Sequence, residues 1–165
     1  MLNCIKHEEQ SIMEEKIAIL YIDDEENNLL SFRAAFRRKY SIYTATSGEQ
    51  GLTILQDHKV HIIITDQRMP NMTGVELLEK VKASYPDPIR ILLTGYTDMS
   101  AVIDAINKGK IYHYLTKPWK EAELDHVILK AYEIYNERLH LISSNEELTI
   151  SNDQLEFLLR QKLLS

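Results

Sequence analysis

The sequence has little cysteine and no long apolar run. Its one cysteine, Cys4, excludes an intramolecular disulfide and is typical of a reducing compartment. No apolar run approaches the ~20 residues that a bilayer-spanning helix needs. Acidic residues near the start stand where a signal peptide would have its apolar stretch. The sequence therefore predicts a cytoplasmic protein with no membrane contact.

Positive charge is also scarce. The chain has 25 Asp and Glu against 19 Lys and Arg, for a formal net charge of −6. The densest basic stretch, FRAAFRRKY, is interpreted as the solvated face of a helix. Without a broad basic surface, the chain is not expected to bind nucleic acid directly.

What the sequence does contain is a regular alternation of two patterns. Runs rich in Ile, Val and Leu predict strands buried on both faces of a parallel sheet. The segments between them carry apolar residues at helical spacing. Five strands alternating with five helices predict an α/β fold with a doubly wound, five-stranded parallel sheet. The expected strands are 17–22, 41–45, 60–65, 89–93 and 111–115.

Local signals mark the expected helix ends. Ser47 and Thr73 each stand three residues before a Gln or Glu, which is the spacing of a capping box. Thr97 or Asp98 is expected to cap the fourth helix, and Gly109 is expected to end it.

The 165 residues suggest one domain with an appendage. Residues 1–15 are polar and without period, and we expect a flexible tail. Residues 16–136 contain the alternating pattern and form the expected folded domain. Residues 137–165 form the expected helical extension, since the last helix meets no Gly or Pro after it begins near Glu121.

The extension contains a seven-residue repeat, SNEELTI at 144–150 followed by SNDQLEF at 151–157. Such a repeat predicts a coiled coil. Asparagine at position a favours a parallel two-stranded register, so a parallel homodimer is expected. Position d holds Leu141, Leu148 and Leu155, and position a holds Asn145, Asn152 and Leu159.

Two observations leave other structures open for the extension. Ile150 and Phe157 fall on position f, which faces water in a simple dimer, so they would pack on another element or in a larger bundle. Ser144 and Glu147 have capping-box spacing and would allow the helix to break there. In that case the segment would be a tail or a linker.

Polar side chains end four of the expected strands. Asp23 and Asp24 close the first strand, Asp66 closes the third, and Thr94 and Lys117 close the last two. Because the carboxyl ends of parallel strands meet at one edge of the sheet, these five side chains are expected to share one pocket. Three carboxylates suit a hard divalent cation, and a hydroxyl with an ammonium suits phosphoryl oxygens. The pattern therefore predicts phosphoryl chemistry.

This pattern resembles the receiver domain of bacterial two-component response regulators over roughly residues 16–135. Receivers of hydrogenase-expression regulators or of cyclic-dinucleotide phosphodiesterase regulators are especially similar, through DQRMP, LLTGY and YLTKPW. The matching residues are Asp23-Asp24, Asp66 with Met69-Pro70 and Gly74, Thr94-Gly95, and Tyr114 with Lys117-Pro118.

The resemblance implies a role for each site residue. Asp66 would accept a phosphoryl group from a histidine kinase or a phosphotransfer protein. Magnesium would be held by Asp24, by Asp66 and by the backbone carbonyl of Arg68, with Asp23 acting through water. Lys117 and Thr94 would contact the phosphoryl oxygens.

The resemblance also implies a switch. The hydroxyl of Thr94 would turn toward the phosphoryl group, and Tyr114 would rotate into the vacated space. Gly95 is expected to allow a close approach of the backbone, and the Lys117-Pro118 peptide is expected to be cis. Tyr96 would shield the acyl phosphate from water.

Two other functions are open. The chain would be the input part of a longer regulator if an enzymatic output domain lies outside it. An aspartyl-nucleophile phosphatase is a remote alternative, since such enzymes have Asp-x-Asp after the first strand and this chain has Asp23-Asp24-Glu25. We expect a signalling module that modifies only itself and is not an enzyme; its output partner is not identified by the sequence.

Overall fold

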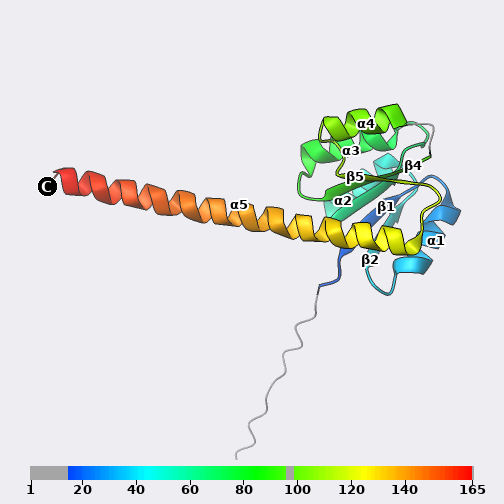
Figure 1. The fold of residues 1–165 in the computed structure, drawn as a ribbon, viewed down its shortest axis with the longest axis horizontal. Coiled ribbons are helices and arrows are strands. Elements are labelled where there is room, and N and C mark those ends of the chain that lie inside the picture. The colour runs from blue at the N-terminus through cyan, green and yellow to red at the C-terminus, as the bar shows by residue number, and fades with distance from the viewer. Residues whose placement is uncertain (1–14, 96–98, 165) are drawn as a thin grey trace, which may run out of the picture.

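The computed structural model describes residues 15–95 and 99–164. It contains one parallel sheet with the strand order β2-β1-β3-β4-β5, as predicted for a doubly wound fold (Figure 1). The strands are β1 (Ala18–Ile22), β2 (Ser41–Ala45), β3 (Ile62–Asp66), β4 (Ile89–Thr94) and β5 (His113–Thr116). The third and fifth strands depart most from their expected ranges, since β3 begins two residues later than 60 and β5 begins two residues later than 111.

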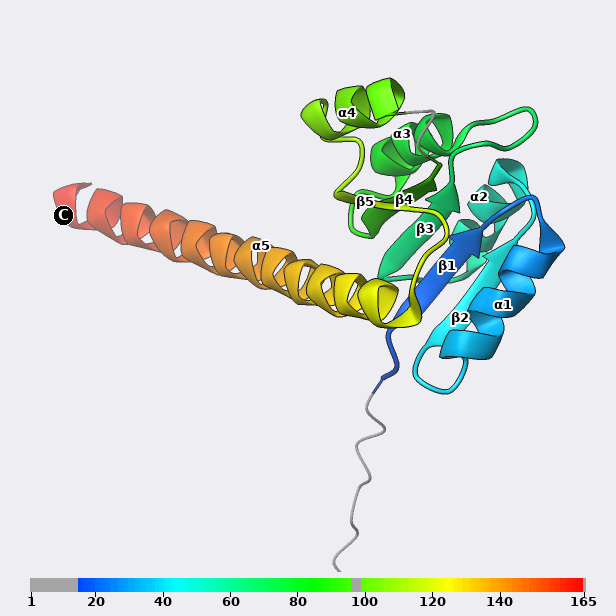
Figure 2. The ribbon, with the colours of Figure 1, turned by 45° about the vertical axis from the view of Figure 1, so that its right-hand side comes forward.

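Five helices connect and follow the strands. They are α1 (Glu26–Phe36), α2 (Gly48–Asp57), α3 (Gly74–Ser84), α4 (Met99–Asn107) and α5 (Glu121–Leu164). Helices α1 and α5 cover one face of the sheet, and α2, α3 and α4 cover the other (Figure 2). The predicted three-layer α/β fold is confirmed.

The strands are apolar because both faces of the sheet are covered. In β1 every residue is buried, and alternate side chains enter the two cores. Leu20 and Ile22 pack with α2, α3 and α4, whereas Ile19 and Tyr21 pack with α1 and α5. Strand β1 also pairs with β3 in parallel, with Ile22 opposite Thr65, so the carboxyl ends of the two strands lie side by side.

The expected helix caps agree with the structure in part. Thr73 and Glu76 form a full capping box at the start of α3. Ser47 accepts from the amide of Gln50, but the Gln50 side chain accepts from Thr46 rather than from Ser47. Gly109 ends α4 with φ of 66°, which a glycine adopts without strain. The alternative caps at 97 and 98 lie outside the described residues.

Helix α5 is continuous over 44 residues, about 66 Å at 1.5 Å per residue. Its first part packs on the sheet through Leu124, Ile128, Ala131 and Tyr135. Beyond Tyr135 it extends away from the domain (Figure 1). The helix does not break at Ser144, so the alternative of two shorter helices is wrong. Within the described part of the chain, no helix is both long and apolar enough to cross a membrane.

Candidate functional site

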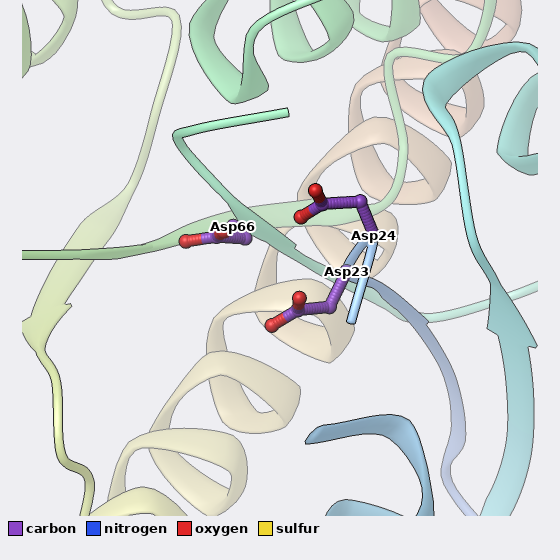
Figure 3. A group of neighbouring side chains, drawn as sticks. All are labelled: Asp23, Asp24 and Asp66. Atoms are coloured by element: carbon purple, nitrogen blue, oxygen red, sulfur yellow. The ribbon is translucent and has the colours of Figure 1, made fainter. Parts of the chain in front are cut away.

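Three carboxylates gather where β1 and β3 end. The ligand oxygens of Asp23, Asp24 and Asp66 lie within 4.8 Å of one another. Their side chains turn to the same side of the sheet edge (Figure 3). Asp23 and Asp66 are buried and Asp24 is exposed, so the cluster is open to solvent on one side only.

Asp23 is the most constrained of the three acids. It has no solvent exposure, and both of its carboxylate oxygens accept hydrogen bonds. Oδ1 accepts from the backbone amide of Glu25 at 3.0 Å. Oδ2 accepts from the hydroxyl of Tyr21 at 2.9 Å, from the amide of Asn28 at 3.0 Å and from Lys117 at 2.9 Å. A buried carboxylate needs such donors to replace its lost water.

Lys117 bridges two of the acids. Its Nζ lies 2.9 Å from Oδ2 of Asp23 and 3.1 Å from Oδ1 of Asp66. Burial alone would lower the pKa of Lys117, but the two carboxylates outweigh burial and raise the pKa above its ordinary value. The ammonium therefore stays charged and offsets part of the acidic cluster.

Asp66 lies at the end of β3 and is 9% exposed. Burial raises the pKa of Asp66, and the charge of Lys117 opposes that shift without cancelling it. The pKa values of both partners are raised, because burial is the largest effect at the carboxylate, whereas at the ammonium the contributions of Asp23 and Asp66 together exceed that of burial. A partly desolvated carboxylate beside a cation is suited to react with an electrophilic phosphoryl group.

The loop after Asp66 is held by the buried side chain of Gln67. Its Oε1 accepts from the amide of Val75 at 2.9 Å, and its carbonyl accepts from the amide of Gly74 at 3.0 Å. Gly74 lies so close to β3 that an added Cβ would collide with the carbonyl oxygen of Asp66. The start of α3 is thereby seated directly against the acid.

Thr94 and Tyr114 lie on neighbouring strands. Thr94 is fully buried, and its Oγ1 donates to the carbonyl of Gly95 at 3.0 Å. Tyr114 is half-buried and packs against the core formed with α2, α3 and α4. Thr94 pairs with Thr116 and Leu92 pairs with Tyr114, so period-two alternation puts Thr94 and Tyr114 on the same face of the sheet.

Other expected features have separate outcomes. Among the residues that the structure describes, a Cβ on Gly95 would meet no atom within 4 Å, so the close backbone approach expected there stays a prediction. The glycine in close contact with the acid is Gly74, which α3 seats against the carbonyl oxygen of Asp66. The Lys117-Pro118 peptide is cis. Tyr96 lies outside the described residues, and the side chain of Arg68 is exposed.

Sequence reasoning missed two residues of the site, Tyr21 and Asn28. Tyr21 is the one residue of AILYI with a hydroxyl, and it stands two positions before Asp23, on the same face of the strand. That spacing was the available signal. Asn28 gave no signal, because its contact with Asp23 depends on how α1 sits over β1.

Residues 19–129 match the response regulator receiver domain. The chain belongs to this family. It is the receiver domain type found in two-component systems, as the strand-end pattern implied. Receivers of this family generally bind Mg²⁺ at an acidic cluster, and the chain has such a cluster in Asp23, Asp24 and Asp66.

Two relatives share the name hydrogenase transcriptional regulatory protein HoxA. The chain is 31% identical to the protein from Cupriavidus necator over 152 residues, which is 92% of this chain and 32% of that protein. It is 32% identical to the protein from Bradyrhizobium diazoefficiens over 117 residues, which is 71% of this chain and 24% of that protein. The chain thus spans a quarter to a third of these relatives.

One solved receiver domain is similar to most of this chain. It is the signal receiver domain of an HD domain-containing protein from Pseudomonas fluorescens, 33% identical with a TM-score of 0.71. The match covers 74% of this chain and 99% of that one.

Proposed function

We propose that Asp66 accepts a phosphoryl group from a phosphohistidine of a histidine kinase or a phosphotransfer protein. The observation that carries this proposal is the position of Lys117, whose ammonium lies between Asp23 and Asp66 at the end of the sheet. An ammonium held by two buried carboxylates beside a third acid is placed to bind the negatively charged oxygens of a phosphoryl group.

The proposed transfer is a displacement at phosphorus. An oxygen of the Asp66 carboxylate attacks the phosphorus atom, and a P–O bond forms as the P–N bond to the donor imidazole breaks. The electron pair of the P–N bond stays with the imidazole. The product is an acyl phosphate on Asp66. Lys117 and the hydroxyl of Thr94 would hold phosphoryl oxygens, so the chain contributes positioning and charge.

The acidic cluster fits a magnesium ion, because its donors are hard carboxylate oxygens in a partly open site. Asp24, Asp66 and the backbone carbonyl of Arg68 would bind it, and Asp23 would act through water. When bound, the ion supplies positive charge that offsets repulsion between the acids and the incoming phosphoryl group.

The experiment that tests the acceptor uses phosphoramidate, a small P–N donor. The native protein with Mg²⁺ should shift on a phosphate-affinity gel, and the shift should vanish with a chelator. Asp66→Asn should not shift under either condition. A chelator-resistant shift, or a shift of Asp66→Asn equal to that of the native protein, would contradict the assignment.

The proposed switch uses Thr94 and Tyr114. The hydroxyl of Thr94 now donates to the carbonyl of Gly95 and would turn to the phosphoryl group. Tyr114, on the same sheet face, would move into the space that Thr94 leaves.

The chain would change its own contacts once per phosphorylation and would not turn over substrate, so it would act as a signalling module and not as an enzyme. The single cysteine fits a reducing compartment, and we place this function in the cytoplasm.

The proposed folded domain is 16–136, because the last side chain of α5 that is buried against the sheet is Tyr135. Residues 137–165 would form a parallel two-stranded coil with a second copy. The d-position side chains in this segment are 57–62% exposed in the single chain, and a partner helix would cover them. They are Leu141, Leu148 and Leu155.

Light scattering tests the dimer. The molar mass is measured in Mg²⁺ with and without beryllofluoride, which mimics a phosphoryl group, and Asp66→Asn is the control. A mass that doubles only in the native protein with the mimic would make the coil the output of the switch. A dimer in all conditions would make the coil a fixed scaffold. A monomer in all conditions would contradict the coil.

A second candidate follows from the comparison with HoxA. Because this chain spans only a quarter to a third of those relatives, it also fits the input part of a longer regulator. Helix α5 would then carry the change onward to an output domain. Fusing a reporter domain after residue 165 and measuring its dimerisation with beryllofluoride would test this role.

A further inference from the structure

A tyrosine hydroxyl lies inside the acidic site, in contact with the carboxylate of Asp23. Tyr21 is in β1, has no solvent exposure, and donates to Oδ2 of Asp23 at 2.9 Å. The phenol hydroxyl has this carboxylate oxygen as its acceptor, and burial keeps water away from the contact.

The ring of Tyr21 is fixed by aromatic packing. Its centroid lies 4.4 Å from that of Phe32 on α1, and Phe32 lies 6.1 Å from Trp119. Trp119 follows Lys117 by two residues. The same aromatic group thus supports the strand end that carries Asp23 and the loop that carries Lys117.

Three donors converge on one oxygen. Oδ2 of Asp23 accepts from Tyr21, from Asn28 and from Lys117 at 2.9–3.0 Å. A carboxylate oxygen has about two lone-pair sites. Tyr21 and Asn28 alone are enough to fill them. Lys117 is therefore the surplus donor on Oδ2, and it is also the one with a second acceptor, Oδ1 of Asp66.

We propose that Tyr21 is a positioning residue that frees Lys117 for the phosphoryl group. When Lys117 turns to the phosphoryl oxygens, Tyr21 and Asn28 keep Asp23 bonded and in place. Without the phenol, Asn28 would be the one donor left on Oδ2 besides Lys117, so Asp23 would hold Lys117 more tightly and compete with the phosphoryl group for it. This inference rests on the proposed function of Asp66.

The test is Tyr21→Phe, which removes one oxygen and keeps the ring. Mg²⁺ binding is measured by titration calorimetry, and beryllofluoride binding is measured at saturating Mg²⁺. In the resting state Lys117 and Asn28 still hold Asp23, so Mg²⁺ affinity should change less than about twofold. Beryllofluoride affinity should fall on the order of tenfold, the size expected for one hydrogen bond to a charged group.

Tyr40→Phe is the matched control. Tyr40 packs in the same core, and its hydroxyl also donates to a carboxylate, that of Asp125 on α5. Removing this hydroxyl should lower thermal stability and leave both affinities unchanged. Asn28→Ala is the second test variant, because Asn28 is half-buried on α1 and lies outside the core. It should weaken beryllofluoride binding in the same direction even if Tyr21→Phe folds poorly.

The result that overturns the inference is beryllofluoride affinity in Tyr21→Phe equal to that of the native protein. A parallel fall in Mg²⁺ and beryllofluoride affinity would overturn it too, since that pattern reports general damage to the site. If the native protein itself fails to bind beryllofluoride with Mg²⁺, the proposed function fails and the inference fails with it. The native arm therefore separates the two failures.

Discussion

The ammonium of Lys117 lies 3.1 Å from Oδ1 of Asp66. The contact joins the ends of β3 and β5, two strands with β4 between them. It holds the two residues together although they are 51 positions apart in the sequence. The same ammonium reaches Asp23, so one cation links three strand ends.

Lys117→Ala should destabilise the protein and make its stability depend on Mg²⁺. Without the ammonium, Asp23 and Asp66 are left close together with less compensation, at a cost of about 1–3 kcal/mol. A bound divalent cation should return part of that stability by mass action. Urea unfolding with Mg²⁺ or with a chelator measures both effects.

Lys39→Ala is the control for that experiment. Lys39 pairs with Asp125 at 3.1 Å, but its side chain is 55% exposed. Such a pair contributes about 0–1 kcal/mol and lies away from the acidic cluster. Equal Mg²⁺ dependence in the two variants would count against a role for Lys117 in balancing the acids.

Gly74→Ala should destabilise the protein and disturb Asp66. The added Cβ would collide with the carbonyl oxygen of Asp66 and would come within 2.7 Å of Leu92. Overpacking against backbone typically costs about 1–3 kcal/mol. Gly95→Ala is the matched control, because its Cβ would meet no atom of the described residues within 4 Å. Thermal unfolding should lower the Tm for Gly74→Ala only, and equal losses would refute the assignment.

His61 should make stability depend on pH. Its Nδ1 accepts from the amide of Ala18 at 2.9 Å, and its ring meets Tyr132 and Tyr135 of α5 edge-on. Burial lowers the pKa of His61; the charge of Glu15 opposes this shift, and that of Lys59 adds to it. The unfolded chain therefore takes up the proton at a higher pH than the folded one. The neutral His61 ring makes its full contribution to the free energy of unfolding above the unfolded-state pKa of about 6.5. That contribution is lost as the pH falls below this value.

The pH dependence is measured as the free energy of unfolding at about pH 8 and about pH 5.5. The slope from one such group is at most about 1.4 kcal/mol per pH unit. His61→Asn offers an acceptor near the place of Nδ1 but does not titrate. The native protein should lose more stability on acidification than this variant. Identical losses of unfolding free energy in the two proteins would mean that other groups cause the loss of stability at low pH.

Asn152→Leu should strengthen association of the proposed coil and reduce its selectivity. An asparagine at position a costs stability but favours a parallel two-stranded register. Sedimentation equilibrium should show tighter association with additional stoichiometries for the variant. Ser151→Leu changes a neighbouring position g and serves as the control. An unchanged association constant in Asn152→Leu would argue that residue 152 faces solvent in solution.

Much of the site followed from the sequence, because strand ends of a parallel sheet meet by topology. Recognising Ile-rich runs was enough to bring Asp23, Asp66, Thr94 and Lys117 to one edge. The identity of the close-packed glycine did not follow. The close approach of Gly74 to Asp66 depends on how deeply α3 seats against β3, and local pattern does not encode that depth.

The contacts of Tyr21 and His61 also escaped sequence reasoning. Both depend on side chains that meet across elements, Tyr21 with Asn28 at Asp23 and His61 with α5. In the extension, the capping-box spacing at Ser144 suggested a break that does not occur. The helix continues there, because capping-box spacing within a segment free of Gly and Pro does not by itself end a helix. The heptad pattern in α5 stays a prediction, since a coil requires a second chain.

The most direct test of the central claim is the position of the phosphoryl group. The protein is phosphorylated with Mg²⁺ and treated with hydroxylamine, which converts an acyl phosphate to a hydroxamate and releases phosphate. Peptide mass mapping then finds the modified residue. The account predicts one hydroxamate, at Asp66, and none in Asp66→Asn. A hydroxamate at Asp23, at Asp24 or on α5 would contradict the assignment of Asp66 as the acceptor.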